Sequence, residues 1–157
     1  MGRSMLAVES PAERPVMPDQ HRPRLARADL VDLLTRIQRT LVRDLGAALE
    51  EEGVTVDQWR VLRALADEER SMGELAGALE IPHPTLTRIV DTLVDSAFLY
   101  RSQSEEDRRK VSVHVSDLGH DKLHRLESLA AAHEGALAVR LGPDTVAGLS
   151  TLLRGLA

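Results

Sequence analysis

Four side chains between residues 83 and 88 have the chemistry to contact nucleic acid: His83, Thr85, Thr87 and Arg88. A guanidinium such as that of Arg88 can donate two hydrogen bonds to a guanine edge, a contact that discriminates between bases by about 1–3 kcal/mol. Threonine side chains can contact a phosphate or the methyl group of a thymine. The alternative interpretation is that Arg88 only pairs with Asp91 or with a phosphate.

A second candidate is the polar stretch SQSEEDRR, which begins directly after Arg101 and contains Asp107, Arg108 and Arg109. We expect Arg109 to enter the minor groove of a duplex, because a guanidinium is planar and always charged. Asp107 repels DNA by its charge, so its expected role is to hold Arg108 or Arg109 in an extended pose. Arg101 adds a further cation. The alternative is an exposed tip whose ion pairs contribute little.

Metal and catalytic chemistry have weaker support in the sequence. His120 and His124 are four residues apart, which places two imidazoles on one helical face and is a start for a metal site. A tetrahedral site needs further ligands, and none stands out, so surface or packed histidines are the favoured interpretation. The sequence contains no glycine-rich phosphate loop, no GxSxG elbow and no HExxH. We therefore expect no enzyme activity and no cofactor.

The residues around the first candidate stretch predict a helix-turn-helix. Ser71 and Glu74 form a capping box at a helix start, and Pro82 ends that helix. Pro84 fits the first turn of the next helix, where its missing N–H costs nothing. Apolar side chains at helical spacing predict the buried stripe of that second helix: Leu86, Ile89, Val90, Leu93, Val94 and Ala97. The polar side chains of residues 85–92 are left on its outward face.

Two short strands are expected next, at residues 98–101 and 110–115, because the second alternates apolar and polar side chains. The polar stretch between them has no apolar anchor and is expected to project as the tip of a hairpin. A helix-turn-helix followed by a hairpin is a winged helix. The predicted fold is therefore mainly α with a small β-hairpin wing.

Long amphipathic helices are expected on both sides of this module, at about 29–51 and 116–141, with a shorter one from Pro143. A small winged helix cannot bury their apolar stripes alone, and an identical subunit is the most economical partner. We expect residues 1–24, with four prolines, to be a disordered or extended arm that is solvated or contacts phosphates. The expected divisions of residues 25–157 are dimerisation helices at about 25–52 and 116–157 and a winged helix-turn-helix at about 55–115.

The order of these parts resembles the MarR family of bacterial transcription regulators. The blocks LAGALEIPHPTLTRIVDTLVDSAFLYR and EEDRRKVSVHVSDLGHDKL carry the resemblance, and Asp107 and Arg109 match the Asp-x-Arg motif of the family's wing. The resemblance implies a homodimer that binds an inverted-repeat operator in double-stranded DNA, and we expect a repressor relieved by a small-molecule effector. The family also has zinc-responsive members that use histidines in the long helix, so His120 and His124 keep a metal-responsive regulator open.

Trp59 is a candidate for the effector pocket, which the resemblance places among the first, second and long C-terminal helices. Its position in an apolar stripe with Val61, Leu62 and Leu65 also fits plain core packing, which is the favoured interpretation. Only three residues of the chain are aromatic, so the class of ligand cannot be inferred from the sequence.

The net charge of the chain, −5, agrees less well with DNA binding, because basic side chains that neutralise phosphates supply much of the affinity for DNA. The acid clusters at residues 50–52 and 67–69 are expected at helix ends away from the motif. A winged helix can also serve as a protein-interaction module, but such a face would carry exposed Leu, Phe or Trp in place of threonine and arginine. The chain has no cysteine and no apolar stretch of membrane-spanning length, and we expect a cytoplasmic protein without a membrane partner.

Overall fold

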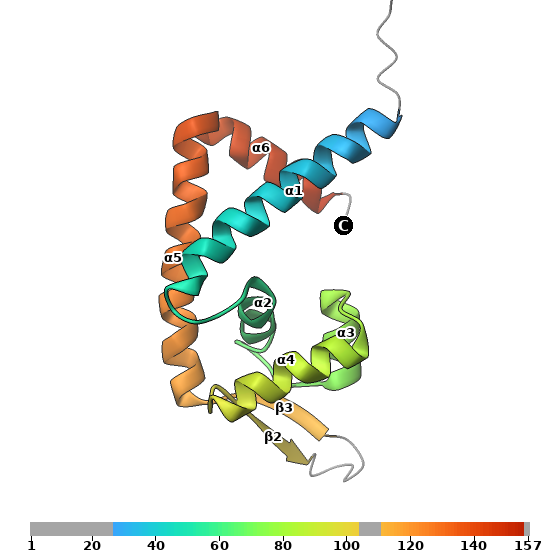
Figure 1. Ribbon diagram of the computed structural model, residues 1–157, viewed down its shortest axis with the longest axis vertical. Helices are drawn as coiled ribbons and strands as arrows, with labels where there is room; N and C mark the ends of the chain where they lie inside the picture. The colour runs from blue at the N-terminus through green and yellow to red at the C-terminus, as the bar shows by residue number, and fades with distance from the viewer. Residues whose placement is uncertain (1–26, 104–110, 156–157) are drawn as a thin grey trace, which may run out of the picture. The chain divides into compact units, whose positions relative to one another are not determined.

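The computed structural model describes residues 27–103 and 111–155, so the expected N-terminal arm lies outside the described residues. The helices and strands occur in the following order: α1 (Arg27–Glu50), α2 (Val56–Ala64), β1 (Arg70–Ser71), α3 (Met72–Leu79), α4 (His83–Asp95), β2 (Leu99–Gln103), β3 (Val111–Val115), α5 (Asp117–Leu141) and α6 (Pro143–Arg154) (Figure 1). None of the helices in these two ranges is both long and apolar enough to span a bilayer.

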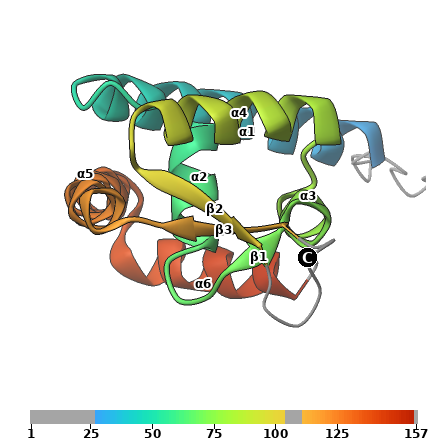
Figure 2. The same cartoon turned by 90° about the horizontal axis from the view of Figure 1, so that it is seen from below.

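The chain divides into two compact units, residues 1–35 and residues 36–157, and α1 begins in the first and ends in the second. The second unit holds the hydrophobic core, which forms around α2. This helix contacts α3, α4 and α5 (Figures 1 and 2). The most completely buried side chains are aliphatic: Leu49, Val61, Leu62, Leu75, Leu86, Val90, Leu93, Val113 and Leu126.

Local hydrogen bonds at the helix starts agree with the sequence. At α3, the Glu74 backbone N–H donates to Ser71 Oγ at 3.3 Å, and the Ser71 N–H donates to Glu74 Oε2 at 2.8 Å. The same reciprocal pair joins Thr55 and Gln58 at α2. Pro84 lies in the first turn of α4, as predicted. These caps satisfy backbone donors that have no partner inside a helix, and so they fix where α2 and α3 begin.

The β-sheet differs from the predicted hairpin because it has three antiparallel strands in the order β1-β3-β2. The additional strand β1 pairs with β3, with Arg70 opposite Val113 and Ser71 opposite Ser112. A strand of two residues has no alternation to detect, which is why the sequence did not predict it. Strand β2 also extends to Gln103, beyond the predicted end at Arg101.

One residue of the predicted stripe on α4 was wrongly placed. Ala97 is exposed and lies beyond the helix, which ends at Asp95. Its φ of 60° is in the left-handed region, where the chain turns from α4 into β2. The Phe98 N–H then donates to the Leu93 carbonyl oxygen at 2.9 Å and closes this turn. The buried stripe of α4 is therefore shorter than its periodicity suggested.

Candidate nucleic-acid interface

The outward face of α4 is polar over its whole length. His83, Thr85 and Arg88 are exposed, as is Asp91 one turn further on. Thr87 differs, because it is half-buried and its hydroxyl donates to the His83 carbonyl oxygen at 2.9 Å. On the opposite face Leu86, Val90 and Leu93 are buried in the core and fix the rotation of the helix about its axis. Of the four candidate side chains on α4, His83, Thr85 and Arg88 are therefore the ones exposed to a ligand.

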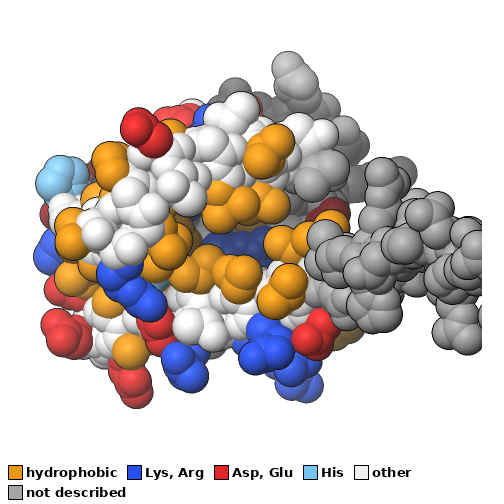
Figure 3. Space-filling view, turned by 90° about the horizontal axis from the view of Figure 1, so that it is seen from above, with side chains coloured by type: hydrophobic (Ala, Val, Ile, Leu, Met, Phe, Trp, Pro, Cys, Tyr) orange, Lys and Arg blue, Asp and Glu red, His pale blue; other side chains and the backbone are white. Residues whose placement is uncertain are grey.

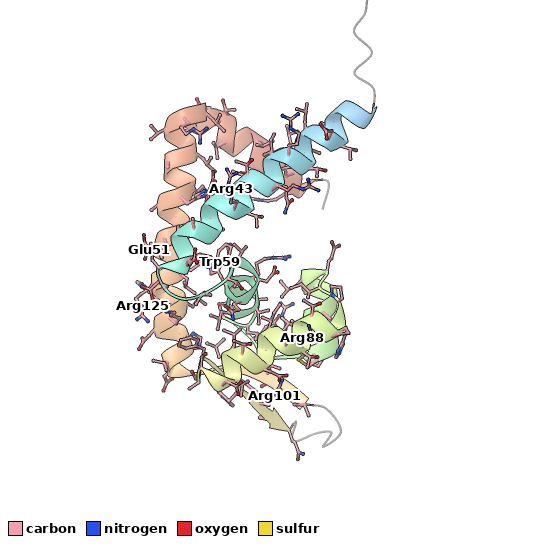
Figure 4. All side chains as sticks on the ribbon, viewed as in Figure 1. Arg43, Glu51, Trp59, Arg88, Arg101 and Arg125 are labelled. Carbon is pink, nitrogen blue, oxygen red and sulfur yellow. The ribbon has the colours of Figure 1, made fainter. Side chains whose placement is uncertain are left out.

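The side chain of Arg88 has no hydrogen bond or ion pair to any of the residues that the structure describes, and its position on α4 is labelled in Figure 4. The expected alternative partner, Asp91, instead accepts a hydrogen bond from Arg101 Nη2 at 2.6 Å. This ion pair joins α4 to β2, and about a third of the Arg101 side chain stays exposed. Arg101 thus offsets a negative charge that would otherwise repel a phosphate backbone from α4.

Asp107, Arg108 and Arg109 lie outside the described residues, which include the base of the wing in β2 and β3. Its outer face carries a polar cluster that the sequence did not predict. The ring of His114 stacks on Tyr100 with centroids 4.9 Å apart, and His114 Nε2 lies 2.6 Å from Ser102 Oγ. His114 Nδ1 lies 3.2 Å from a carboxylate oxygen of Glu69. Because cross-strand partners share a face, the pairing of Tyr100 with His114 could have been found from the register of the hairpin.

Trp59 is both a core residue and the wall of a cavity. The residue is 9% exposed, and its Nε1 donates to Glu127 Oε1 on α5 at 3.0 Å. The guanidinium of Arg63 lies 5.3 Å from the centre of the Trp59 ring. A cavity of about 230 Å³ beside it is lined by side chains of α1, α2 and α5, with Leu45, Trp59, Arg63 and Glu127 among them. Trp59 also lines a more open hollow of about 440 Å³ together with Val42 and Arg60.

The two histidines that suggested a metal site are both exposed on α5. Within residues 27–103 and 111–155, no group of three or more His, Cys, Asp or Glu side chains is arranged to hold a metal ion. His120 and His124 therefore have no further protein ligand in the part of the chain that the structure describes.

The order of the elements, the polar outward face of α4 and the sheet behind it define a winged helix-turn-helix of the DNA-binding class. Comparisons with known proteins narrow this class. A model of the MarR family matches residues 52–110. A solved structure of a mutant MarR from E. coli complexed with operator DNA is 25% identical, with a TM-score of 0.74 over 82% of this chain and 93% of that one. The repressor CouR bound to a 23-mer DNA duplex is 28% identical, with a TM-score of 0.76 over 84% and 97%.

Curated relatives agree with the structures. The HTH-type transcriptional regulator YpoP of Bacillus subtilis is 26% identical over 58% of this chain and 64% of its own length, so the chain spans slightly less than two thirds of that relative. A Thauera aromatica protein that carries the name of a transcriptional regulatory protein for the hcr operon is 25% identical over 87% of this chain and 91% of its own length. The family model, the solved structures and the curated relatives show that the chain is similar to DNA-binding transcriptional regulators of the MarR family.

Proposed function

We propose that the protein is a homodimeric repressor that binds an inverted-repeat operator in double-stranded DNA and is released by a small-molecule effector. The observation that carries the proposal is the outward face of α4, where the Arg88 side chain is exposed and has no partner among the described residues. Two similar structures, the mutant MarR and CouR, contain bound DNA and support operator binding by this chain. In a helix-turn-helix the outward face of the second helix contacts the base edges of the major groove.

The proposed DNA interface has two parts with different tasks. Arg88 contacts a guanine edge, with Thr85 and His83 at the helix start, and this part selects the sequence. Arg101 at the base of the wing and Arg108 and Arg109 at its tip contact the backbone and the minor groove, and this part supplies affinity. Asp107 is proposed to hold the arginines of the tip. The roles at residues 107–109 rest on the sequence alone.

A homodimer is supported by apolar side chains that the described part of the protomer leaves exposed. Ile37 is 49% exposed on α1, and Val139 near the end of α5 is 88% exposed. Further exposed aliphatic side chains in the same helices and in α6 are Val42, Leu141, Leu149, Leu152 and Leu153. Hydrophobic side chains gather around a hollow on the face that Figure 3 shows. Contiguous apolar surface of this kind marks an interaction site, and a second copy of the chain is the proposed occupant.

The cavity beside Trp59 is the proposed effector site, because its walls come from the three helices that the family resemblance names. A ligand there would contact the indole ring and compete with the hydrogen bond from Trp59 Nε1 to Glu127. Trp59 is the only tryptophan, so its emission should change when a ligand releases DNA. If a ligand releases DNA without changing the emission of Trp59, the effector site lies elsewhere.

The proposal is tested by fluorescence anisotropy with labelled duplexes from the intergenic DNA upstream of the gene. The wild-type protein should bind one duplex with an inverted repeat far more tightly than a scrambled duplex of the same composition. A protein-interaction module is the competing function, and it would show equal, weak and strongly salt-dependent binding to all duplexes. Location in the cytoplasm stays a prediction from the sequence.

A further inference from the structure

Lys122 is buried on α5, where a lysine is seldom found without a partner. It is 8% exposed. Its Nζ donates to the backbone carbonyl oxygen of Glu52 at 2.5 Å and to Glu52 Oε2 at 2.8 Å. The same ammonium lies 5.6 Å from the centre of the Phe98 ring, close enough for an attraction between the cation and the π-electrons. Lys122 thus contacts both the turn between α1 and α2 and the turn between α4 and β2.

The start of α5 is fixed to the second of these turns by its backbone. Ser116 Oγ donates to the Ala97 carbonyl oxygen at 2.6 Å, and the Ser116 N–H donates to the Phe98 carbonyl oxygen at 3.0 Å. A Cβ atom on Gly119 would overlap that Phe98 oxygen, so only glycine fits there. Because Ala97 and Phe98 follow α4 directly, the first turn of α5 holds the end of the helix that is proposed to contact DNA.

Glu52, in the turn that follows α1, connects this part of α5 to the end of α1. The contacts between Lys122, Glu52 and Phe98 are called the Lys122 joint below. The Glu52 carboxylate accepts hydrogen bonds from Lys122 and from Arg125 Nε, which lies 3.3 Å away. The hydrogen bond from Lys122 is the main cause of a lowered pKa for Glu52. Arg125 lies on α5 beside the α1–α2 turn, where Figure 4 labels it together with Glu51. Three segments distant in the sequence therefore meet at the single ammonium group of Lys122.

Stability alone is a poor reason for this arrangement. Taking an ammonium group out of water costs free energy that its ion pair only partly returns, and an apolar side chain of similar volume would often serve equally well. An apolar side chain cannot make hydrogen bonds, and so it cannot fix the positions of neighbouring elements by hydrogen-bond geometry. Hydrogen bonds to a carbonyl and a carboxylate fix the ammonium at one place relative to α1, and the Phe98 contact fixes it relative to the end of α4.

We propose that Lys122 is a positioning residue for DNA binding, which sets the angle between α4 and the helices α1 and α5 and thereby the spacing of the two recognition helices in the dimer. This inference rests on the proposed function, since it needs a dimer on an inverted repeat. The centres of the two half-sites are then about 34–36 Å apart, one turn of the duplex. Each added base pair both moves and rotates one half-site, so a rigidly held α4 can fit only one spacing.

The test compares Lys122→Met with wild type on labelled operators whose half-sites are moved closer or further apart by one base pair. Wild type should prefer one spacing strongly. In Lys122→Met that preference should fall by about fivefold or more, a change within the range of coupling between sites. Arg125→Ala is the matched control, because Arg125 contacts the same carboxylate but not Phe98, and it should keep the wild-type spacing profile.

Folding is checked separately, so that a misfolded variant is not mistaken for one with a changed spacing preference. The double variant Lys122→Met with Glu52→Gln removes both the buried ammonium group and its carboxylate partner, and the Arg125 side chain that also loses this partner is half exposed. The double variant should fold and show the same flattened profile. Lys122→Arg should restore part of the preference. A folded Lys122→Met or double variant with the wild-type spacing profile would overturn the positioning role. If wild type prefers no sequence, or is a monomer on its best duplex, the proposed function itself fails.

Discussion

At the scale of single residues, the guanidinium of Arg88 is exposed on α4, and it has no partner among the described residues. An arginine that already pairs inside the protein would lose that pair on binding, whereas Arg88 loses only water. Two parallel hydrogen bonds from one guanidinium fit the edge of a guanine, and lysine cannot reproduce that geometry. Arg88 is therefore the residue on which sequence selection should depend most.

We expect Arg88→Ala to reduce discrimination at one base position of each half-site by about 1–3 kcal/mol. Arg88→Lys should keep most of the affinity for phosphates, because lysine has the same positive charge. It should lose most of that discrimination, because lysine lacks the two parallel N–H donors of the guanidinium. Binding constants for the operator and for duplexes with single base changes would measure both effects. Equal weakening on every duplex would leave Arg88 with a phosphate contact only.

Asp91 gives a second prediction at this scale, through its ion pair with Arg101. Asp91→Asn should release the Arg101 guanidinium and remove a negative charge from the outward face of α4. Non-specific DNA binding should tighten, and the dependence of log K on log salt should steepen by up to about 0.9 for each further phosphate that the variant neutralises. Thermal stability should change by less than about 1 kcal/mol, since the pair is exposed.

Asp95→Asn is the matched control, because Asp95 is exposed one turn further along α4 and its side chain has no partner among the described residues. It removes the same charge without releasing Arg101, and its salt dependence should stay close to that of wild type. Weaker binding by Asp91→Asn would show the opposite role, in which Asp91 holds Arg101 in the pose that contacts DNA.

At the scale of elements, the close approach of α5 to the α4–β2 turn depends on one glycine. We expect Gly119→Ala to destabilise the protein by at least about 1–3 kcal/mol, because the new methyl group would overlap backbone that cannot easily move. Gly77→Ala on α3 is the control, since a methyl group there would meet no atom within 4 Å and alanine favours a helix by up to about 1 kcal/mol. Urea unfolding curves measure both; similar midpoints for the two variants would contradict the close contact.

The joint between Glu52 and Lys122 predicts a dependence of stability on pH. The pKa of Glu52 is lowered in the folded state, so its ionised form stabilises the fold above the ordinary glutamate pKa of about 4.3. That contribution is lost as the pH falls through the lowered value. The difference in Tm between wild type and Glu52→Gln should therefore be constant near neutral pH and shrink in acid. A difference that grows on acidification would contradict the lowered pKa.

Much of the element order could be predicted from the sequence, because its signals are local. Capping boxes at Thr55 and Ser71, the proline in the first turn of α4 and the alternation in β3 each act within a few residues. The joint at Lys122 could not be predicted, because its partner Glu52 is 70 residues away and lies in a turn. Nor could the pairing of His114 with Glu69, which depends on a loop that no pattern describes. The DNA-contacting roles of the individual residues stay predictions.

At the scale of the whole molecule, the exposed aliphatic side chains of α1, α5 and α6 predict that folding and association are coupled. Leu153→Glu places a charge on α6 at a side chain that is 43% exposed in the protomer, and it should shift the protein toward monomers. Val111→Glu is the control, with a similarly exposed side chain on the wing, and it should sediment like wild type. Sedimentation velocity over a range of protein concentrations measures the shift, and a folded wild-type monomer at micromolar concentration would contradict the dimer.

Two copies of this chain are proposed to select one inverted repeat in DNA. Selection of bound sequences from a pool of random duplexes, followed by sedimentation of the protein with the selected duplex, tests it most directly. We predict a selected inverted repeat with half-site centres about 10–10.5 base pairs apart and two protomers on each duplex. A selected pool without any common sequence, or a single half-site occupied by one protomer, would contradict the account.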